Sequence, residues 1–219
     1  MKIKYLTFDC YGTLIDWKAG IEENFRSFNN NRQLNTGIDI FHSYVELEAK
    51  KEKAYKPYKA ILKDTSLELA KSMGLGPSDS AAEKFANSIT HWPAFTDTAP
   101  TLKELGKAGY RRVILSNIDR DLLQETIRNN NLEVDGFITA QDISSYKPGE
   151  KHWIEFLKSY KAKKEEVLHV ANSIYHDIIP AARLGLKTVW VNRYGESLPD
   201  DINSSYVVNR LSDLLNLLR

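Results

Sequence analysis

The sequence is poor in cysteine and has no long apolar run. Its 219 residues include one cysteine, Cys10, and two methionines. A single cysteine excludes an intrachain disulfide and a cysteine-rich metal site. No apolar run is long enough to span a bilayer. The first run, residues 3–8, ends at an aspartate, so no signal peptide is predicted. These absences favour a cytoplasmic protein.

The chain also lacks an excess of charge of either sign. Thirty basic side chains balance 29 acidic ones, for a formal net charge of +1. Partners such as nucleic acid or an anionic membrane select for a basic surface, so neither is expected. Hydrophobic residues make up 42% of the chain. That content, at this length, suits one large domain or a core domain that carries an insertion.

The stretch FDCYGTL, residues 8–14, joins an apolar run to a tight turn. The run ends abruptly at Asp9, and Gly12 and Thr13 follow. This pattern indicates a buried strand that stops at a carboxylate held by the turn. A carboxylate at the end of a strand can act as a nucleophile, which is the role predicted for Asp9. The alternative is that Asp9 only caps the turn.

Hydrophobic periodicity divides the rest of the chain into two parts. Residues 16–95 show helical spacing and no convincing strand, whereas strands and helices alternate from residue 97 onward. Alternation indicates βαβ units and an α/β fold with a Rossmann-like, doubly wound, mainly parallel sheet. The predicted domains are an α/β core of residues 1–15 and 96–219 and an inserted helical cap of residues 16–95.

Individual elements follow from the same spacing. Tyr55, Tyr58 and Leu62 share one helical face, and a further helix is expected over 64–73. Asp119 is predicted to cap the helix that follows it. The other expected helices are 81–89, 102–108, 153–160 and 211–218, and the expected strands are 112–115, 136–140, 167–171, 188–191 and 206–208.

Polar residues gather where the predicted strands end. Ligands bind such sheets beyond the carboxyl ends of the strands. Those ends carry Asp9, the pair Ser116-Asn117 and the pair Asn172-Ser173. Asp177 lies just beyond the last pair, and Lys147 lies on the loop after strand 136–140. We therefore expect one crevice with the helical block above it. His169, inside a strand, is interpreted as a packed core histidine.

Four segments together resemble the haloacid dehalogenase superfamily. They are FDCYGTLIDW, VILSNIDRDLL, SSYKPGEKHW and VLHVANSIYHDIIPAARLGLKTVWVNR. Phosphatases of that superfamily carry a second aspartate two residues after the nucleophile, where it protonates a departing alkoxide. This chain has Tyr11 there, as in the L-2-haloacid dehalogenase branch. A departing halide is so weak a base that it needs no proton.

The resemblance implies a covalent mechanism for removing halide from a small 2-halo acid. Asp9 would displace the halide and form an ester, which water then hydrolyses. Asp177 would activate or orient that water, and Lys147 would favour the ionised form of Asp9. The residues assigned to holding the substrate, the nucleophile or Asp177 are Tyr11, Thr13, Ser116, Asn117, Asn172 and Ser173.

The chain departs from this branch at the predicted anion clamp. Dehalogenases of the branch have an arginine on the first cap helix for the substrate carboxylate, and alignment on SYVELE puts Ser43 there. Serine does not replace a bidentate arginine. Arg26 or Lys50 would have to supply the charge. Ile174 and Trp153 also differ from the residues expected at their positions.

Two alternatives to dehalogenation stay open. One is a Mg²⁺-dependent phosphatase that holds the metal through Asp9 and Asp177 and takes its general acid from Tyr11 or His176. The other is a binding or regulatory protein that keeps the fold without chemistry. Asn172 stands where many phosphatases have another aspartate, so a site without metal or other cofactor is favoured. The expected partner is a small anionic substrate, and a homodimer is left open.

Overall fold

A computed structural model describes residues 2–28, 39–76, 78–197 and 204–219. Six parallel strands form one sheet in the order β3-β2-β1-β4-β5-β6. The predicted Rossmann-like α/β fold is thereby confirmed. After β1 the chain adds strands first on one side and later on the other, so β1 lies at the topological switch point. The strands are β1 (Tyr5–Phe8), β2 (Arg111–Ser116), β3 (Gly136–Thr139), β4 (Val167–Ala171), β5 (Lys187–Val191) and β6 (Tyr206–Val208).

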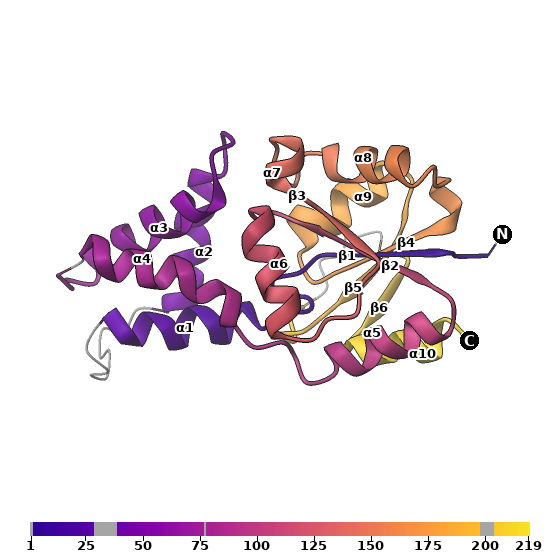
Figure 1. Cartoon of the computed structure of the whole chain (residues 1–219), viewed down its shortest axis with the longest axis horizontal. Helices are drawn as coiled ribbons and strands as arrows, with labels where there is room; N and C mark the ends of the chain where they lie inside the picture. Colours follow the sequence, from indigo (N-terminus) through magenta and orange to yellow (C-terminus); the bar gives the residue numbers. More distant parts are fainter. Residues whose placement is uncertain (1, 29–38, 77, 198–203) are drawn as a thin grey trace.

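Successive residues of the strands face two different cores, as the pleat requires. Ile114 of β2 packs with Leu102 and Leu123 on one face. Its neighbour Leu115 packs with Trp153 and Phe156 on the other. Figure 1 shows α8 and α9 over one face and α5 and α10 over the opposite face. The helices of this part are α5 (Thr98–Lys107), α6 (Arg120–Asn129), α7 (Ala140–Ile143), α8 (Lys151–Ser159), α9 (Ile179–Arg183) and α10 (Leu214–Leu217).

The first four described helices after β1 form a separate group at the left of Figure 1, beside the carboxyl ends of the strands. We call them the cap helices. On α1, Gly20 lies so close to Trp92 that a Cβ there would be 2.3 Å from the indole ring. None of the described helices is both long and apolar enough to cross a membrane. The cap helices are α1 (Trp17–Phe28), α2 (Ile40–Lys51), α3 (Tyr58–Ser72) and α4 (Asp79–Ser88).

Some element boundaries differ from the prediction. Residues 58–72 form the single helix α3, so no separate helix begins at residue 64. The strand predicted over 136–140 ends at Thr139, because a capping box between Thr139 and Asp142 starts α7. The last predicted helix is a short 3₁₀ turn followed by the single turn α10. The remaining short elements are 3₁₀ turns at Ile89–His91, Lys164–Glu166 and Leu211–Asp213 and a π-helical turn at Ile174–Ile178.

The prediction that Asp119 caps α6 is wrong about its partner. The Asp119 side chain makes no capping bond to α6. Its two carboxylate oxygens instead accept the backbone N–H groups of Tyr58 and Lys59, each at 2.9 Å. These two N–H groups belong to the first turn of α3. Pro57, the residue before α3, makes no side-chain capping bond. A carboxylate of the core therefore satisfies the first turn of a cap helix.

Candidate active site

The turn after β1 holds Asp9 at the edge of the sheet. The Asp9 backbone N–H donates to the carbonyl of Val170 at 3.1 Å, which continues the pairing with β4. Gly12 has a φ of +93°, a conformation that glycine adopts without strain. Thr13 Oγ1 donates to Asp9 Oδ2 at 2.9 Å and accepts the backbone N–H of Asn172 at 2.9 Å. One oxygen of Asp9 is thus fixed by its own turn.

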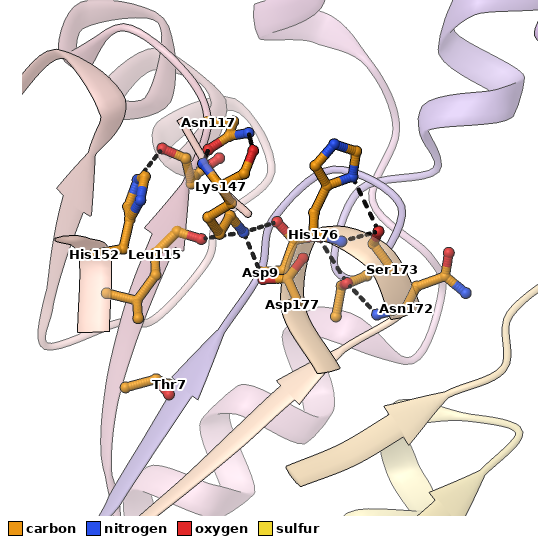
Figure 2. A network of polar contacts seen from close by, with 12 residues as sticks. Thr7, Asp9, Leu115, Asn117, Lys147, His152, Asn172, Ser173, His176 and Asp177 are labelled. Atoms are coloured by element: carbon orange, nitrogen blue, oxygen red, sulfur yellow. Dashed lines mark hydrogen bonds and ion pairs between the residues drawn. The ribbon is translucent and has the colours of Figure 1, made fainter. Parts of the chain in front are cut away.

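Lys147 joins the two carboxylates of the site (Figure 2). Its Nζ donates to Asp9 Oδ1 at 2.7 Å, to Asp177 Oδ1 at 2.6 Å and to the carbonyl of Leu115 at 3.0 Å. An ammonium group has three N–H donors, so all of them are used. Burial lowers the pKa of Lys147, but Asp177 and Asp9 outweigh burial and raise the pKa above its ordinary value. The lysine is a permanent cation.

The two carboxylates differ in their balance of forces. Burial raises the pKa of Asp177, but Lys147 and His169 outweigh it, and the resulting pKa is about 2. For Asp9, burial outweighs the attraction of Lys147, and the pKa lies above its ordinary value. Lys147 lowers the pKa of Asp9, as predicted, but burial and the charge of Asp177 raise that pKa.

His169 connects Asp177 to the interior of the sheet. Its Nε2 lies 3.0 Å from Asp177 Oδ1, and its Nδ1 lies 2.9 Å from Thr7 Oγ1. If the Thr7 hydroxyl donates to Nδ1, the proton sits on Nε2 and is donated to Asp177. The interpretation of His169 as a core residue therefore missed its contact with the site. The register of the sheet pairs it directly with Thr7.

Asn117, Asn172 and Ser173 hold the backbone or neighbouring side chains. Asn117 Oδ1 accepts the N–H of Lys147 at 2.7 Å, and its Nδ2 donates to the carbonyl of Lys147 at 3.0 Å. Asn172 Nδ2 donates to the carbonyl of Val191 at 3.0 Å. Ser173 Oγ accepts the backbone N–H of His176 and lies 3.1 Å from His176 Nδ1. Figure 2 shows these groups around the lysine and the two carboxylates.

Eight of the nine predicted site residues line one cavity of about 80 Å³. The exception is Thr13, which binds Asp9 but is not among the lining residues. A larger surface hollow of about 570 Å³, beside Phe137 and Ile154, contains none of the predicted residues. The lining residues that the prediction did not include are Trp17, Glu48, Glu52, Tyr58 and His176.

The cap helices contribute carboxyl groups where the resemblance predicts an arginine. Glu48 of α2 is buried, and its Oε1 accepts the Tyr58 hydroxyl at 2.6 Å. Burial raises the pKa of Glu48 to about 7, although the hydroxyls of Tyr58 and Tyr44 oppose the shift. Glu52 follows α2, and its Oε2 lies 3.7 Å from His176 Nε2. Burial and the neighbouring Glu48 raise the pKa of Glu52 well above its ordinary value.

Of the two candidate replacements for the arginine, the structure describes the side chain of Lys50 alone, and Lys50 does not line the cavity. Ser43 is not a lining residue, and Lys50 is exposed. The side chain of Arg26 lies outside the described residues. Among the described lining residues, Lys147 is the only lysine or arginine. Alignment of the sequence pointed to Ser43 on α2, whereas the residue of α2 that lines the cavity is Glu48.

Lys147 lies between Asp9 and Asp177, the two carboxylates that the phosphatase alternative assigns to Mg²⁺. In the described part of the chain, no group of three or more His, Cys, Asp or Glu side chains could hold a metal ion. Lys147 Nζ lies within 2.7 Å of both carboxylates, so its ammonium group already takes the place of a bridging cation. The two carboxylates considered for the phosphatase alternative thus lie in one cavity, with the ammonium group of Lys147 bound to both.

Comparisons with known proteins identify the family of the chain. A model of the haloacid dehalogenase-like hydrolase family matches residues 3–185. The chain is 26% identical over 149 residues to (S)-2-haloacid dehalogenase of Pseudomonas fluorescens, covering 67% of this chain and 65% of that protein. It is 32% identical over 126 residues to glyceraldehyde 3-phosphate phosphatase of Pyrococcus furiosus, covering 54% and 51%.

A solved structure extends the likeness over the whole fold. L-2-haloacid dehalogenase of Xanthobacter autotrophicus superimposes with a TM-score of 0.85 at 21% identity, covering 99% of this chain and 98% of that one. At this identity the superposition concerns the fold alone. The match to the family covers most of the chain, including β1 with Asp9, the lysine loop and the turn that carries Asp177. The chain belongs to the haloacid dehalogenase-like hydrolase family.

Proposed function

We propose that the protein is a hydrolase that displaces halide from a small halogenated molecule through an ester of Asp9. The observation that carries this proposal is the state of the two candidate proton donors. The Tyr11 hydroxyl is bound to Thr126 Oγ1 at 2.7 Å, and burial raises the pKa of Tyr11 well above its ordinary value. Burial lowers the pKa of His176, so its imidazole is neutral near pH 7. Neither Tyr11 nor His176 therefore readily supplies a proton, which suits a leaving group that needs none.

The reaction takes place in two balanced steps. A carboxylate oxygen of Asp9 attacks the carbon that bears the halogen, and the carbon–halogen bond breaks with its electron pair on the halide. Water then attacks the carboxyl carbon of the Asp9 ester. This releases the hydroxylated product and one proton and restores the carboxylate. Asp177, with a pKa of about 2, remains an anion that can accept a hydrogen bond from the attacking water.

The departing halide needs a hydrogen-bond donor within the cavity. Lys147 has no donor left, because its three N–H groups are bound. Trp17 lines the cavity, and its indole nitrogen is buried without a hydrogen-bond partner among the described residues. We assign this N–H to the halide, since a buried donor is stabilised by any acceptor that reaches it.

Metal independence follows from the same geometry. The Lys147 ammonium binds both carboxylates and offsets one of the two negative charges that would otherwise attract a divalent cation. We therefore expect unchanged halide release in EDTA and no stimulation by Mg²⁺. Cytoplasmic localisation and a homodimer remain predictions.

The experiment is halide release from 2-chloropropionate and 2-chloropropionamide, with Asp9→Asn as the inactive variant. Multiple turnovers that are lost in the variant support the ester mechanism. A single turnover in H₂¹⁸O should place ¹⁸O in the peptide that contains Asp9, because water attacks the carboxyl carbon of the ester. Mg²⁺-dependent hydrolysis of an alkyl phosphate, with no halide release from either compound, would instead establish the phosphatase alternative.

A further inference from the structure

The cavity around Asp9 has an unusual balance of charge for a site expected to take an anion. Four carboxyl groups line it, from Asp9, Asp177, Glu48 and Glu52. The single lysine among the described lining residues already donates to two of them and to a backbone carbonyl. Among the residues that the structure describes, no cationic donor in the cavity is therefore left for a carboxylate of the substrate.

The two glutamates lie on the cap side of the cavity. Glu48 belongs to α2, and Glu52 lies immediately after that helix. The Tyr58 hydroxyl accounts for Oε1 of Glu48. On the core side, His176 Nε2 lies 3.7 Å from Glu52 Oε2, and Asn117 and Lys147 also act on the Glu52 carboxyl. Each carboxyl group keeps at least one acceptor oxygen in either protonation state, so the cap side offers hydrogen-bond acceptors within the cavity that contains Asp9.

We propose that Glu48 and Glu52 are specificity-determining residues that select a substrate with N–H donors, a primary amide or an ammonium group, in place of the carboxylate of a 2-halo acid. The chemical step at Asp9 rests on the function proposed above, whereas the selection of the polar group is a property of binding. A substrate carboxylate meets like charge on whichever glutamate is ionised and binds only with both of them protonated, whereas an amide N–H is accepted by a carboxyl oxygen in either protonation state.

Glu52 also lines a second, outer cavity of about 320 Å³, together with Lys147 and His176. The inner cavity has about 80 Å³, so it holds only the reacting end of a substrate. Glu52 thus lies where the two spaces meet. A substituent on the nitrogen of an amide bound to Glu52 can extend into the outer cavity, whose walls include Tyr55 and Tyr146.

The test compares 2-chloropropionate with 2-chloropropionamide, which differ only in the group that meets the glutamates. We expect kcat/KM to favour the amide by at least about tenfold in the wild type. Glu52→Gln and Glu48→Gln should lower kcat/KM for the amide and raise it for the acid. Glu46→Gln removes the same charge from the exposed face of α2 and should change neither. An ammonium arm, 3-chloropropylammonium, tells a charged donor from a neutral one.

Binding without chemistry keeps the inference separate from the reaction. Propionamide and propionate are titrated calorimetrically into the Asp9→Asn variant, with and without Glu52→Gln. Tighter binding of propionamide, reversed by Glu52→Gln, supports the selection even if no halide is released, in which case only the proposed reaction fails. Binding of propionate at least as tight as that of propionamide, unchanged by Glu52→Gln, overturns the inference and leaves the reaction intact.

Discussion

The carboxylate of Asp119, at the start of α6, accepts the backbone N–H of Tyr58, at the start of α3, at 2.9 Å. The second oxygen accepts the N–H of Lys59 at the same distance. Nearby, the Tyr146 hydroxyl donates to the carbonyl of Lys56 at 2.6 Å. The core therefore holds the amino end of α3 by polar contacts on either side of Pro57. Since Tyr58 also binds Glu48, the placement of the acidic side of the cavity depends on this attachment.

Replacing Asp119 by alanine should destabilise the protein by about 1–2 kcal/mol, because two helix-opening N–H groups lose their acceptor. Asp119→Asn keeps one acceptor oxygen and should lose about half as much. Urea unfolding monitored by circular dichroism measures the change. Asp121→Ala removes an exposed carboxylate from the first turn of α6 and serves as the control. Equal effects of the two alanine variants would contradict the assigned capping role.

Glu48 should make stability depend on pH. Its folded pKa of about 7 lies above the ordinary value of 4.5, so the folded state binds the proton more tightly than the unfolded state. The stabilisation is complete below the unfolded pKa and is lost as the pH rises through 7. Between about pH 4 and pH 8, wild type should lose on the order of 3 kcal/mol relative to Glu48→Gln. Parallel stability curves for the two proteins would refute the buried, protonated state.

The contact of Thr7 with His169 should affect catalysis without touching the substrate. Thr7→Val keeps the shape of a fully buried side chain but removes the hydroxyl that lies 2.9 Å from His169 Nδ1. We expect kcat to fall by about tenfold with little change in KM, since one hydrogen bond holds Asp177 through the histidine. Thr7→Ser should restore most of the activity. A Thr7→Val variant with wild-type kcat would exclude the positioning role.

Trp17→Phe tests the assignment of the halide donor. The substitution keeps an aromatic ring beside Phe41 but removes the indole N–H. Halide release should slow by about tenfold, and chloride inhibition should weaken by a similar factor, whereas hydrolysis of a preformed Asp9 ester should be unaffected. Rapid-quench kinetics separates the two steps. Equal slowing of ester hydrolysis would show that Trp17 acts on packing of the cap rather than on the halide.

Much of the core was predictable because its signals are local. Apolar runs that end in polar residues located β1, β2 and β4, and the rule for parallel sheets then placed Asp9, Ser116 and Asn172 at one edge. The boundary at Thr139 was misplaced by one residue, because a capping box in the tertiary structure ended the strand early. Helix α3 was divided in two because its charged residues interrupt the apolar pattern without breaking the backbone.

Contacts across the cavity were not predictable from spacing. The apolar spacing around Phe41, Tyr44 and Leu47 predicts a helix there, which the structure has as α2. The spacing does not say which face of that helix lines the cavity around Asp9, because the cap and the core are distant in sequence. Asp119 illustrates the same limit: a carboxylate before a helix ordinarily caps that helix, yet here the N–H groups of α3 come closer. Rules for helix capping that use only neighbouring residues fail where backbone N–H groups distant in sequence bind the same carboxylate.

The sequence by itself determined the α/β class, the family and the residues gathered around Asp9, because strand ends and turn residues carry those signals locally. Tyr11 likewise marked the site as one without the usual aspartate acid. Only the tertiary structure decided what surrounds the substrate. It showed that all three N–H donors of Lys147 are hydrogen-bonded within the site and that Glu48 and Glu52 line the cavity from the cap. The charged residues that line the cavity come from segments far apart in the sequence, so only folding brings them together.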